Sequence, residues 1–180
     1  ALAGALSASL SAMVGSLTYS KRGMEGARPA MEAMGRAAQA LTDWFLASVD
    51  RDTDAFNAVL AAVRMPHRTE EDLAARDAAM AAANLDATLV PLTVLERSVE
   101  ALDHAMVAAR DGNPNSVSDA GVAAACAVAA AEGASLNVQI NLDGLEGDTS
   151  EIAARREAAL ESARELGATV MRVVNERLAE

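Results

Sequence analysis

The stretch from Ser118 to Leu142, SDAGVAAACAVAAAEGASLNVQINL, decides the fold class. Alanine dominates it, and it contains neither proline nor an aromatic residue. Alanine is the best helix former, and its thin side chain lets neighbouring helices pack closely. The stretch therefore predicts one long helix that lies close against other helices.

Helical patterns of the same kind fill the rest of the chain. The spacing of apolar residues predicts helices over about 1–19, 29–63, 69–110, 116–142 and 149–180. Glycine- and proline-containing turns separate them, and Pro91 predicts a kink or break inside the third. No repeat or linker divides the chain, so we expect one domain over residues 1–180. The expected fold is all-α, an up-and-down bundle of five or six helices.

Composition and charge narrow the function. The 180 residues carry a net charge of −11, which argues against nucleic acid and anionic membranes because both need a basic face. Residues 1–20 are uncharged but only weakly hydrophobic, so we expect a buried helix there rather than a membrane span. Cys126 is the only cysteine and cannot form an internal disulfide. We expect a cytoplasmic protein.

The familiar chemical motifs are missing from the sequence. It has no glycine-rich phosphate loop and no nucleophile elbow. With His67 and His104 as the only histidines, a histidine-rich metal site is excluded. No metal is expected, and the chemistry must be acid/base and electrostatic.

Asp52 interrupts an apolar row of the second helix. The row runs through residues 41, 45, 49, 56, 59 and 63, and steps of three or four pass through Asp52. A buried carboxylate is costly unless it is paired or protonated, and desolvation raises its pKa toward values useful for proton transfer. The alternatives are a structural ion pair or a rotated helix that exposes Asp52.

Other polar residues fall on apolar rows in the same way. Glu96 lies on the row of the third helix, whereas Asp119 also has the ordinary role of an acid in a first helical turn. Asn137 and Asn141 share one helix face and could bind a heteroaromatic ligand or bond across a helix interface. The first helix carries a row of small residues, which suits close helix packing or a flat ligand: Gly4, Ser7, Ser11, Gly15 and Thr18.

Five motifs in order resemble the formiminotetrahydrofolate cyclodeaminases, the second half of formiminotransferase-cyclodeaminase. Each is weak alone, but together they cover nearly the whole chain. Met13–Arg22 resembles the family's Met-Val-x-x-x-Thr-x-Gly-basic motif, and Val49–Phe56 resembles Val-Asp-x-Asp-x-x-Ala-Phe. Met65–His67 stands where the family has Leu-Pro-Lys, and Pro91–Glu96 matches Pro-Leu-x-x-x-Glu. Gly112–Asp119 and Gly133–Leu142 resemble the Ser-Asp motif and the Gly-Ala-x-x-Asn-Val-x-x-Asn-Leu motif.

Three departures from the family pattern stand out. The family's Pro-Gly-Gly-Gly-Ser segment would lie before Ala1 and is not part of this sequence. Ser20 replaces the usual glycine before the basic pair, and His67 replaces the common lysine. The last change puts any catalytic or tail-binding role of residue 67 in doubt.

The resemblance implies a tetrahydrofolate one-carbon enzyme and a homodimer. The expected reaction is cyclodeamination of 5-formiminotetrahydrofolate to 5,10-methenyltetrahydrofolate and ammonia. The alternatives are methenyltetrahydrofolate cyclohydrolase activity and a non-catalytic helical interaction protein. Tetrahydrofolate would be both substrate and one-carbon carrier.

The resemblance also implies site residues. Asp52 and Asp119 would transfer protons, with Asp50 and Glu96 in support. The substrate-binding residues would be Thr18, Tyr19, Lys21, Arg22, His67, Ser118, Asn137 and Asn141. Among them the asparagines would orient the pterin, and the basic pair would meet the glutamate tail.

Overall fold

The computed structural model describes residues 1–180 as five α-helices joined by short connections, with no strand. The helices are α1 (Leu2–Tyr19), α2 (Arg28–Val63), α3 (Glu70–Asp111), α4 (Val117–Leu142) and α5 (Ser150–Leu178). Two 3-10 turns, Glu25–Ala27 and Pro114–Ser116, precede α2 and α4. The all-α prediction is confirmed, and the predicted helix ends lie within a few residues of the observed ones.

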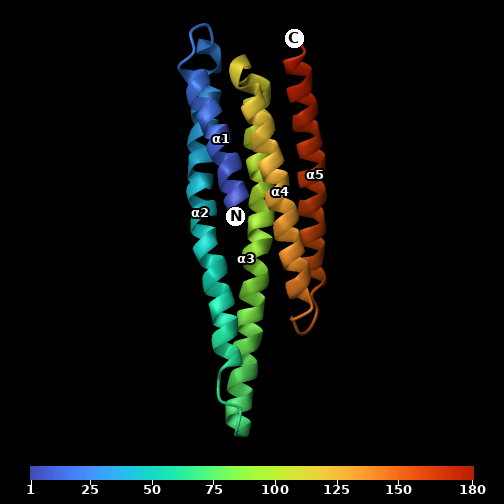
Figure 1. Cartoon of the computed structure of the whole chain (residues 1–180). Coiled ribbons are helices and arrows are strands. Elements are labelled where there is room, and N and C mark those ends of the chain that lie inside the picture. The colour runs from blue at the N-terminus through green and yellow to red at the C-terminus, as the bar shows by residue number, and fades with distance from the viewer.

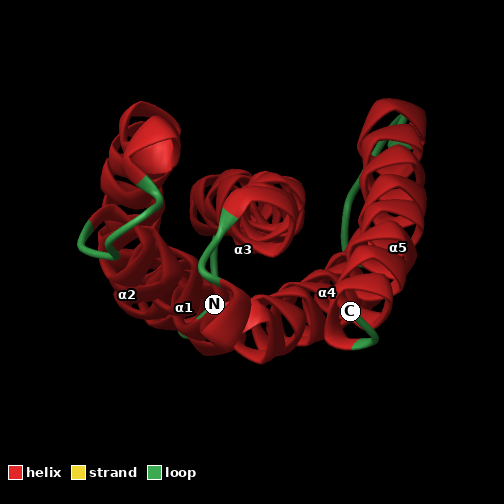
Figure 2. Ribbon diagram, turned by 90° about the horizontal axis from the view of Figure 1, so that it is seen from above, coloured by secondary structure: helices red, strands yellow, loops and turns green.

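The helices run alternately up and down, and α3 is the central one (Figure 1). Seen from above, α2, α1, α4 and α5 form a curved layer, and α3 lies on its inner side (Figure 2). The hairpin of α2 and α3 extends well beyond the other helices at the end opposite the C-terminus (Figure 1). That extension follows from length, since α2 has 36 residues and α3 has 42.

Alanine lets the helices approach closely, as its frequency predicts. The core is a cluster of 27 buried apolar residues, many of them alanines, with Phe45 and three leucines of α3 among its largest members. Gly4 shows how tight the packing is, because a Cβ atom there would lie 2.5 Å from Cε1 of Phe45. The small-residue row of α1 is buried throughout and serves helix packing.

Of the kink or break predicted at Pro91, the break is absent: α3 continues through the proline. A proline in a helix has no N–H for the carbonyl four residues earlier, which here is that of Ala87. The Asn141 side chain of α4 donates Nδ2–H to this carbonyl oxygen at 2.7 Å. The neighbouring helix thus supplies the hydrogen bond that the proline cannot make.

Three helical stretches are long and apolar enough to cross a membrane by length and composition alone. They lie in Leu2–Tyr19, Glu70–Asp111 and Pro114–Leu142, with mean hydropathies of 1.2, 1.5 and 1.4. Between 33% and 50% of the residues in these windows are buried inside the bundle. The expected buried helix at residues 1–20 is thus buried on one side only, with Leu2, Leu6, Met13 and Leu17 exposed.

Candidate functional site

Two adjoining clefts open between α2, α3 and α4, beside the first residues of α1. One has a volume of about 370 Å³ and contains Asp52, Asn84, Asn137 and Asn141 in its wall. The other has a volume of about 760 Å³ and borders the start of α1. Asp52, Asn137 and Ile140 line both, so the two clefts form one continuous depression. Ligand sites commonly have this size and this mixture of apolar walls and few polar groups.

Asp52 is exposed rather than buried, which is the rotated-helix alternative and not the desolvated carboxylate. Along this part of α2 the buried positions are Ser48, Ala55 and Ala62, whereas Phe56 is 61% exposed. The helix is rotated relative to the predicted row, because only its narrow alanine side meets α3 here. The Asp52 carboxylate has no hydrogen bond or ion pair within the chain and stands at the junction of the two clefts.

Three asparagines surround the cleft opposite Asp52. Asn141 bonds across the helix interface to Ala87, which was one of its two predicted roles, and it also lines the cleft. Asn137 is exposed and has no protein partner. Asn84 donates Nδ2–H to the carbonyl oxygen of Gly144 at 3.0 Å, which ties α3 to the turn after α4.

Sequence reasoning missed Asn84. Its signal was visible, since it is a poor helix former in the middle of the alanine-rich run from residue 78 to residue 87. A polar side chain at such a position indicates a role other than helix formation. Here it both fastens a turn and lines the cleft.

Glu96 and Asp50 lie outside the clefts. Glu96 forms an ion pair with Arg155 of α5, with N–O distances of 2.9 and 3.1 Å, on the side of α3 that faces α5. This is the structural ion pair that is the usual alternative for a carboxylate on an apolar row. Asp50 is exposed and does not line either cleft.

A second group of predicted residues gathers at the C-terminal end of α1. Thr18 is buried, donates to the carbonyl of Val14, and accepts a hydrogen bond of 2.8 Å from the backbone N–H of Asn113. Lys21 donates Nζ–H to Oδ1 of Asn113 at 2.6 Å. Thr18 is therefore buried in a contact between α1 and the turn that follows α3, and Lys21 is held against the same turn.

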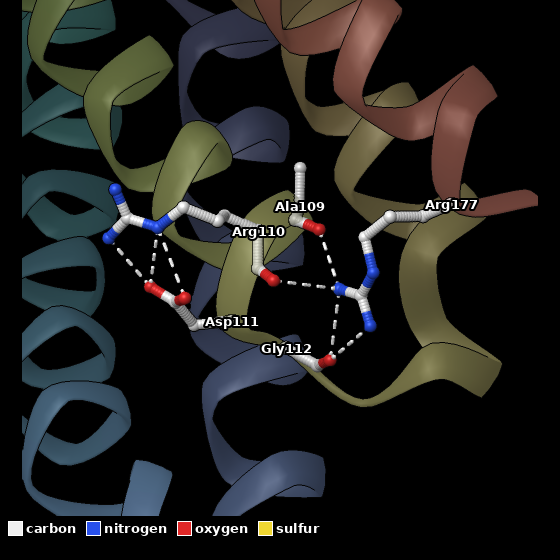
Figure 3. Close-up of polar contacts among 5 residues, drawn as sticks. All are labelled: Ala109, Arg110, Asp111, Gly112 and Arg177. Atoms are coloured by element: carbon white, nitrogen blue, oxygen red, sulfur yellow. Dashed lines mark hydrogen bonds and ion pairs between the residues drawn. The ribbon is translucent and has the colours of Figure 1, made fainter.

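Arg177 of α5 fixes that same turn (Figure 3). Its guanidinium donates to the carbonyl oxygens of Ala109, Arg110 and Gly112 at 2.6 to 3.2 Å. A cation that satisfies the last carbonyls of a helix also interacts favourably with the helix dipole. Beside it, Arg110 pairs with Asp111 at 2.7 Å.

The remaining predicted residues at this end are exposed or half-buried. Tyr19 is 44% exposed, and the guanidinium of Arg28 stacks 5.5 Å from its ring centre. Arg22 and Ser118 are exposed, and Asp119 is half-buried in the first turn of α4. His67 lies far from all of them, exposed in the connection between α2 and α3.

The two predicted proton-transfer groups are separated within one chain. Asp119 belongs to the first turn of α4, whereas Asn137, which lines the clefts with Asp52, lies 18 residues later on the same helix. A rise of about 1.5 Å per residue puts about 27 Å between them. At this separation Asp119 cannot act on the same reacting atoms as a carboxylate beside Asn137 inside a single subunit. No group of three or more His, Cys, Asp or Glu side chains is placed to hold a metal ion.

Comparison with known proteins gives a consistent picture. Residues 1–162 match the formiminotransferase-cyclodeaminase family. Methenyltetrahydrofolate cyclohydrolase of Methylorubrum extorquens is 36% identical over 146 residues, which cover 81% of this chain and 70% of that protein. Formimidoyltransferase-cyclodeaminase of Rattus norvegicus is 32% identical over 80% of this chain but only 27% of its own length.

A solved structure has the same fold. Formiminotetrahydrofolate cyclodeaminase from Thermotoga maritima superposes with a TM-score of 0.76 and 25% sequence identity. The match covers 98% of this chain and 83% of the Thermotoga chain. The match spans 27% of the Rattus norvegicus protein and 33% of the Gallus gallus one, but 70% of the Methylorubrum protein and 83% of the Thermotoga chain.

Proposed function

The chain belongs to the formiminotransferase-cyclodeaminase family, and from that premise we propose that it is a tetrahydrofolate one-carbon enzyme, a formiminotetrahydrofolate cyclodeaminase. One observation carries the proposal beyond family membership. An unpaired carboxylate, that of Asp52, stands in an open cleft among three asparagines, where a heteroaromatic substrate would find both a proton acceptor and polar contacts.

The reaction requires a bound substrate held in the right geometry and a group that transfers protons, and this cleft can provide both. N10 of 5-formiminotetrahydrofolate attacks the formimino carbon, so that an N10–carbon bond forms and the bond to the formimino nitrogen breaks. That nitrogen leaves as ammonia after taking up the N10 proton and one further proton from solvent, and the product is the 5,10-methenyl cation. Holding N10 against the carbon supplies much of the rate. Asp52 would accept the N10 proton and pass it on to the departing nitrogen.

A second reaction has its own support. The relative that matches over most of both chains is a methenyltetrahydrofolate cyclohydrolase. In that reaction water adds to the methenyl carbon, the ring opens at N5, and 10-formyltetrahydrofolate forms. The same carboxylate would then take a proton from the attacking water.

Absorbance of the methenyl cation separates these reactions. Purified protein given 5-formiminotetrahydrofolate should produce the methenyl band with equimolar ammonia. Accelerated loss of added methenyltetrahydrofolate, without activity on the formimino compound, would make the protein a cyclohydrolase. A folded protein inactive in both assays would contradict the proposal and favour a non-catalytic helical protein.

We further propose that the active unit is a homodimer paired through what we call the α1/α4 face. Large apolar side chains are exposed on these two adjacent helices: Leu2, Leu6, Met13, Leu17, Val122, Leu136 and Ile140. The α1 helix carries no charged residue, and Asp119 and Glu132 are the only ones on α4. A surface of this kind is expected to be covered, and a second copy buries it with a matching surface.

The position of this face relates it to the site. Leu2, Leu136 and Ile140 also line the clefts, so a partner seated on the α1/α4 face would form an additional wall of the depression. It is also the arrangement in which Asp119 of the partner subunit could reach the cleft that contains Asp52. The proposed active site would then be shared between two subunits.

The remaining expectations complete the proposal. One cyclodeaminase-like domain would act on a folate in the cytoplasm, without a metal ion, nucleic acid or a membrane. Its single cysteine and net charge of −11 support this assignment. Cell fractionation and turnover in the presence of a strong chelator would check the compartment and the metal.

A further inference from the structure

The amide groups of Asn84 and Asn141 have fixed orientations in the cleft. Asn84 donates Nδ2–H to the carbonyl of Gly144 at 3.0 Å, and Asn141 donates to the carbonyl of Ala87 at 2.7 Å. A backbone carbonyl only accepts hydrogen bonds, so the NH₂ end of each amide must face the protein. The oxygen end of each amide is left without a protein donor.

The polar part of the cleft is therefore rich in acceptors. Besides the two amide oxygens it contains the carboxylate of Asp52, which also lacks a protein donor, and the unpartnered amide of Asn137. No lysine, arginine or histidine lines either cleft, and the first residues of α1, whose backbone N–H groups are free donors, border only the larger one. A ligand that fills the smaller cleft satisfies its acceptors by bringing N–H donors, and a negative charge on the ligand would be repelled by Asp52 there.

The two ends of a tetrahydrofolate meet these conditions differently. The reduced pterin ring carries an amino group and ring N–H groups and has no negative charge. The other end carries the carboxylates of glutamate. Accepting the proposed function, we infer that Asn84 and Asn141 select the pterin end by accepting hydrogen bonds from its N–H groups, and that the glutamate tail lies outside this cleft.

Two fragments of the substrate test this inference without turnover. 6-Methyltetrahydropterin has the pterin ring and no glutamate tail, and p-aminobenzoylglutamate has the glutamate tail and no pterin ring. Calorimetric titration under anaerobic conditions gives the affinity of each for wild type, Asn84→Ala and Asn84→Ser. Serine is too short to place its oxygen where the amide oxygen lies, and it serves if the alanine variant fails to fold.

The expected result is a selective loss. Removing one accepted hydrogen bond should weaken binding of the pterin fragment by about 3- to 10-fold and leave binding of the tail fragment unchanged. Asn57→Ala is the matched control, because Asn57 is an exposed asparagine of α2 outside both clefts. It should change neither affinity.

Three results would overturn the inference. They are equal weakening of both fragments, unchanged affinity for the pterin fragment in a folded variant, and failure of wild type to bind the pterin fragment. A loosened turn at Gly144 would produce the first, since it would disturb the whole cleft alike. Failure of the proposed function is a different observation, namely a wild-type protein that converts neither the formimino nor the methenyl substrate.

Discussion

Asn141 completes the hydrogen bonding that Pro91 interrupts. Its Nδ2 atom lies 2.7 Å from the carbonyl oxygen of Ala87, the group four residues before the proline. The contact joins α4 to α3 beside the candidate site. Asn141, the last asparagine of the Gly-Ala-x-x-Asn-Val-x-x-Asn-Leu motif, therefore stabilises α3 at the proline of the Pro-Leu-x-x-x-Glu motif.

This relationship predicts a double-mutant cycle. Asn141→Leu should lower the free energy of unfolding by about 1–3 kcal/mol, because it leaves the Ala87 carbonyl unsatisfied in a half-buried position. In the Pro91→Ala background the backbone N–H of residue 91 takes over the bond, so the same substitution should cost clearly less. Chemical denaturation of the four proteins measures both effects, and equal costs in the two backgrounds would contradict the relationship.

Asp52→Asn tests the proton-transfer role. Removing a general acid/base group typically lowers the rate by about 10²- to 10⁴-fold, and kcat should fall in that range with little change in thermal stability because the side chain is exposed. Asp54→Asn is the control, since Asp54 is an exposed acid of the same helix that lines neither cleft. Near-native turnover of a folded Asp52→Asn protein would remove the proposed role.

Subunit mixing tests whether the site is shared. Asp52→Asn and Asp119→Asn homodimers should each be nearly inactive. After unfolding and refolding together, half of the dimers are hybrids, and each hybrid has one intact site out of two. Activity should return to about one quarter of the wild-type value. A mixture as inactive as its parents would argue against a shared site, and a monomer in light scattering would argue against the dimer.

Two glycine substitutions should change stability in opposite directions. Gly4→Ala places its Cβ atom 2.5 Å from Cε1 of the Phe45 ring, which is too close. Overpacking of this kind lowers the free energy of unfolding by about 1–3 kcal/mol. Gly133→Ala meets nothing within 4 Å and lies inside α4, where alanine should stabilise by about 0.5–1 kcal/mol. Thermal unfolding checks the signs, and a neutral Gly4→Ala would show that the helices separate easily.

His104 predicts a pH dependence of stability. Burial lowers its pKa below the ordinary value of 6.5, and the opposing effect of Glu100 and Asp103 is smaller. The His104 side chain therefore binds a proton more readily in the unfolded chain. Its titration leaves the free energy of unfolding unchanged above pH 6.5 and lowers it as the pH drops through that value.

Replacing His104 with glutamine should flatten this dependence. Unfolding free energies of His104→Gln and wild type should diverge between about pH 7.5 and pH 5.5. The same substitution at the exposed His67 should leave the curve parallel to wild type. Parallel curves for His104→Gln would show that carboxylates alone account for the acid sensitivity.

The sequence by itself determined the helices and their order. Alanine-rich periodic stretches separated by Met65-Pro66, the Asp111–Asn115 turn and the Asp143–Asp148 loop allow little else, because helix formation and chain reversal depend on residues close in sequence. The motifs that indicate the family are also local, and they led to the same family as the comparison with known proteins.

Only the tertiary structure decided which polar residues meet. Asp52 and Asn137 line the same depression although they are 85 positions apart in the sequence, Asp119 lies about 27 Å from Asn137 along α4, and Glu96 is paired with Arg155. The rotation of a helix about its axis depends on what covers each side, and beyond Ser48 only Ala55 and Ala62 of α2 are buried. A periodic row therefore shows that one face is apolar, but the neighbouring helices determine which residues at its edge reach the solvent and the cleft.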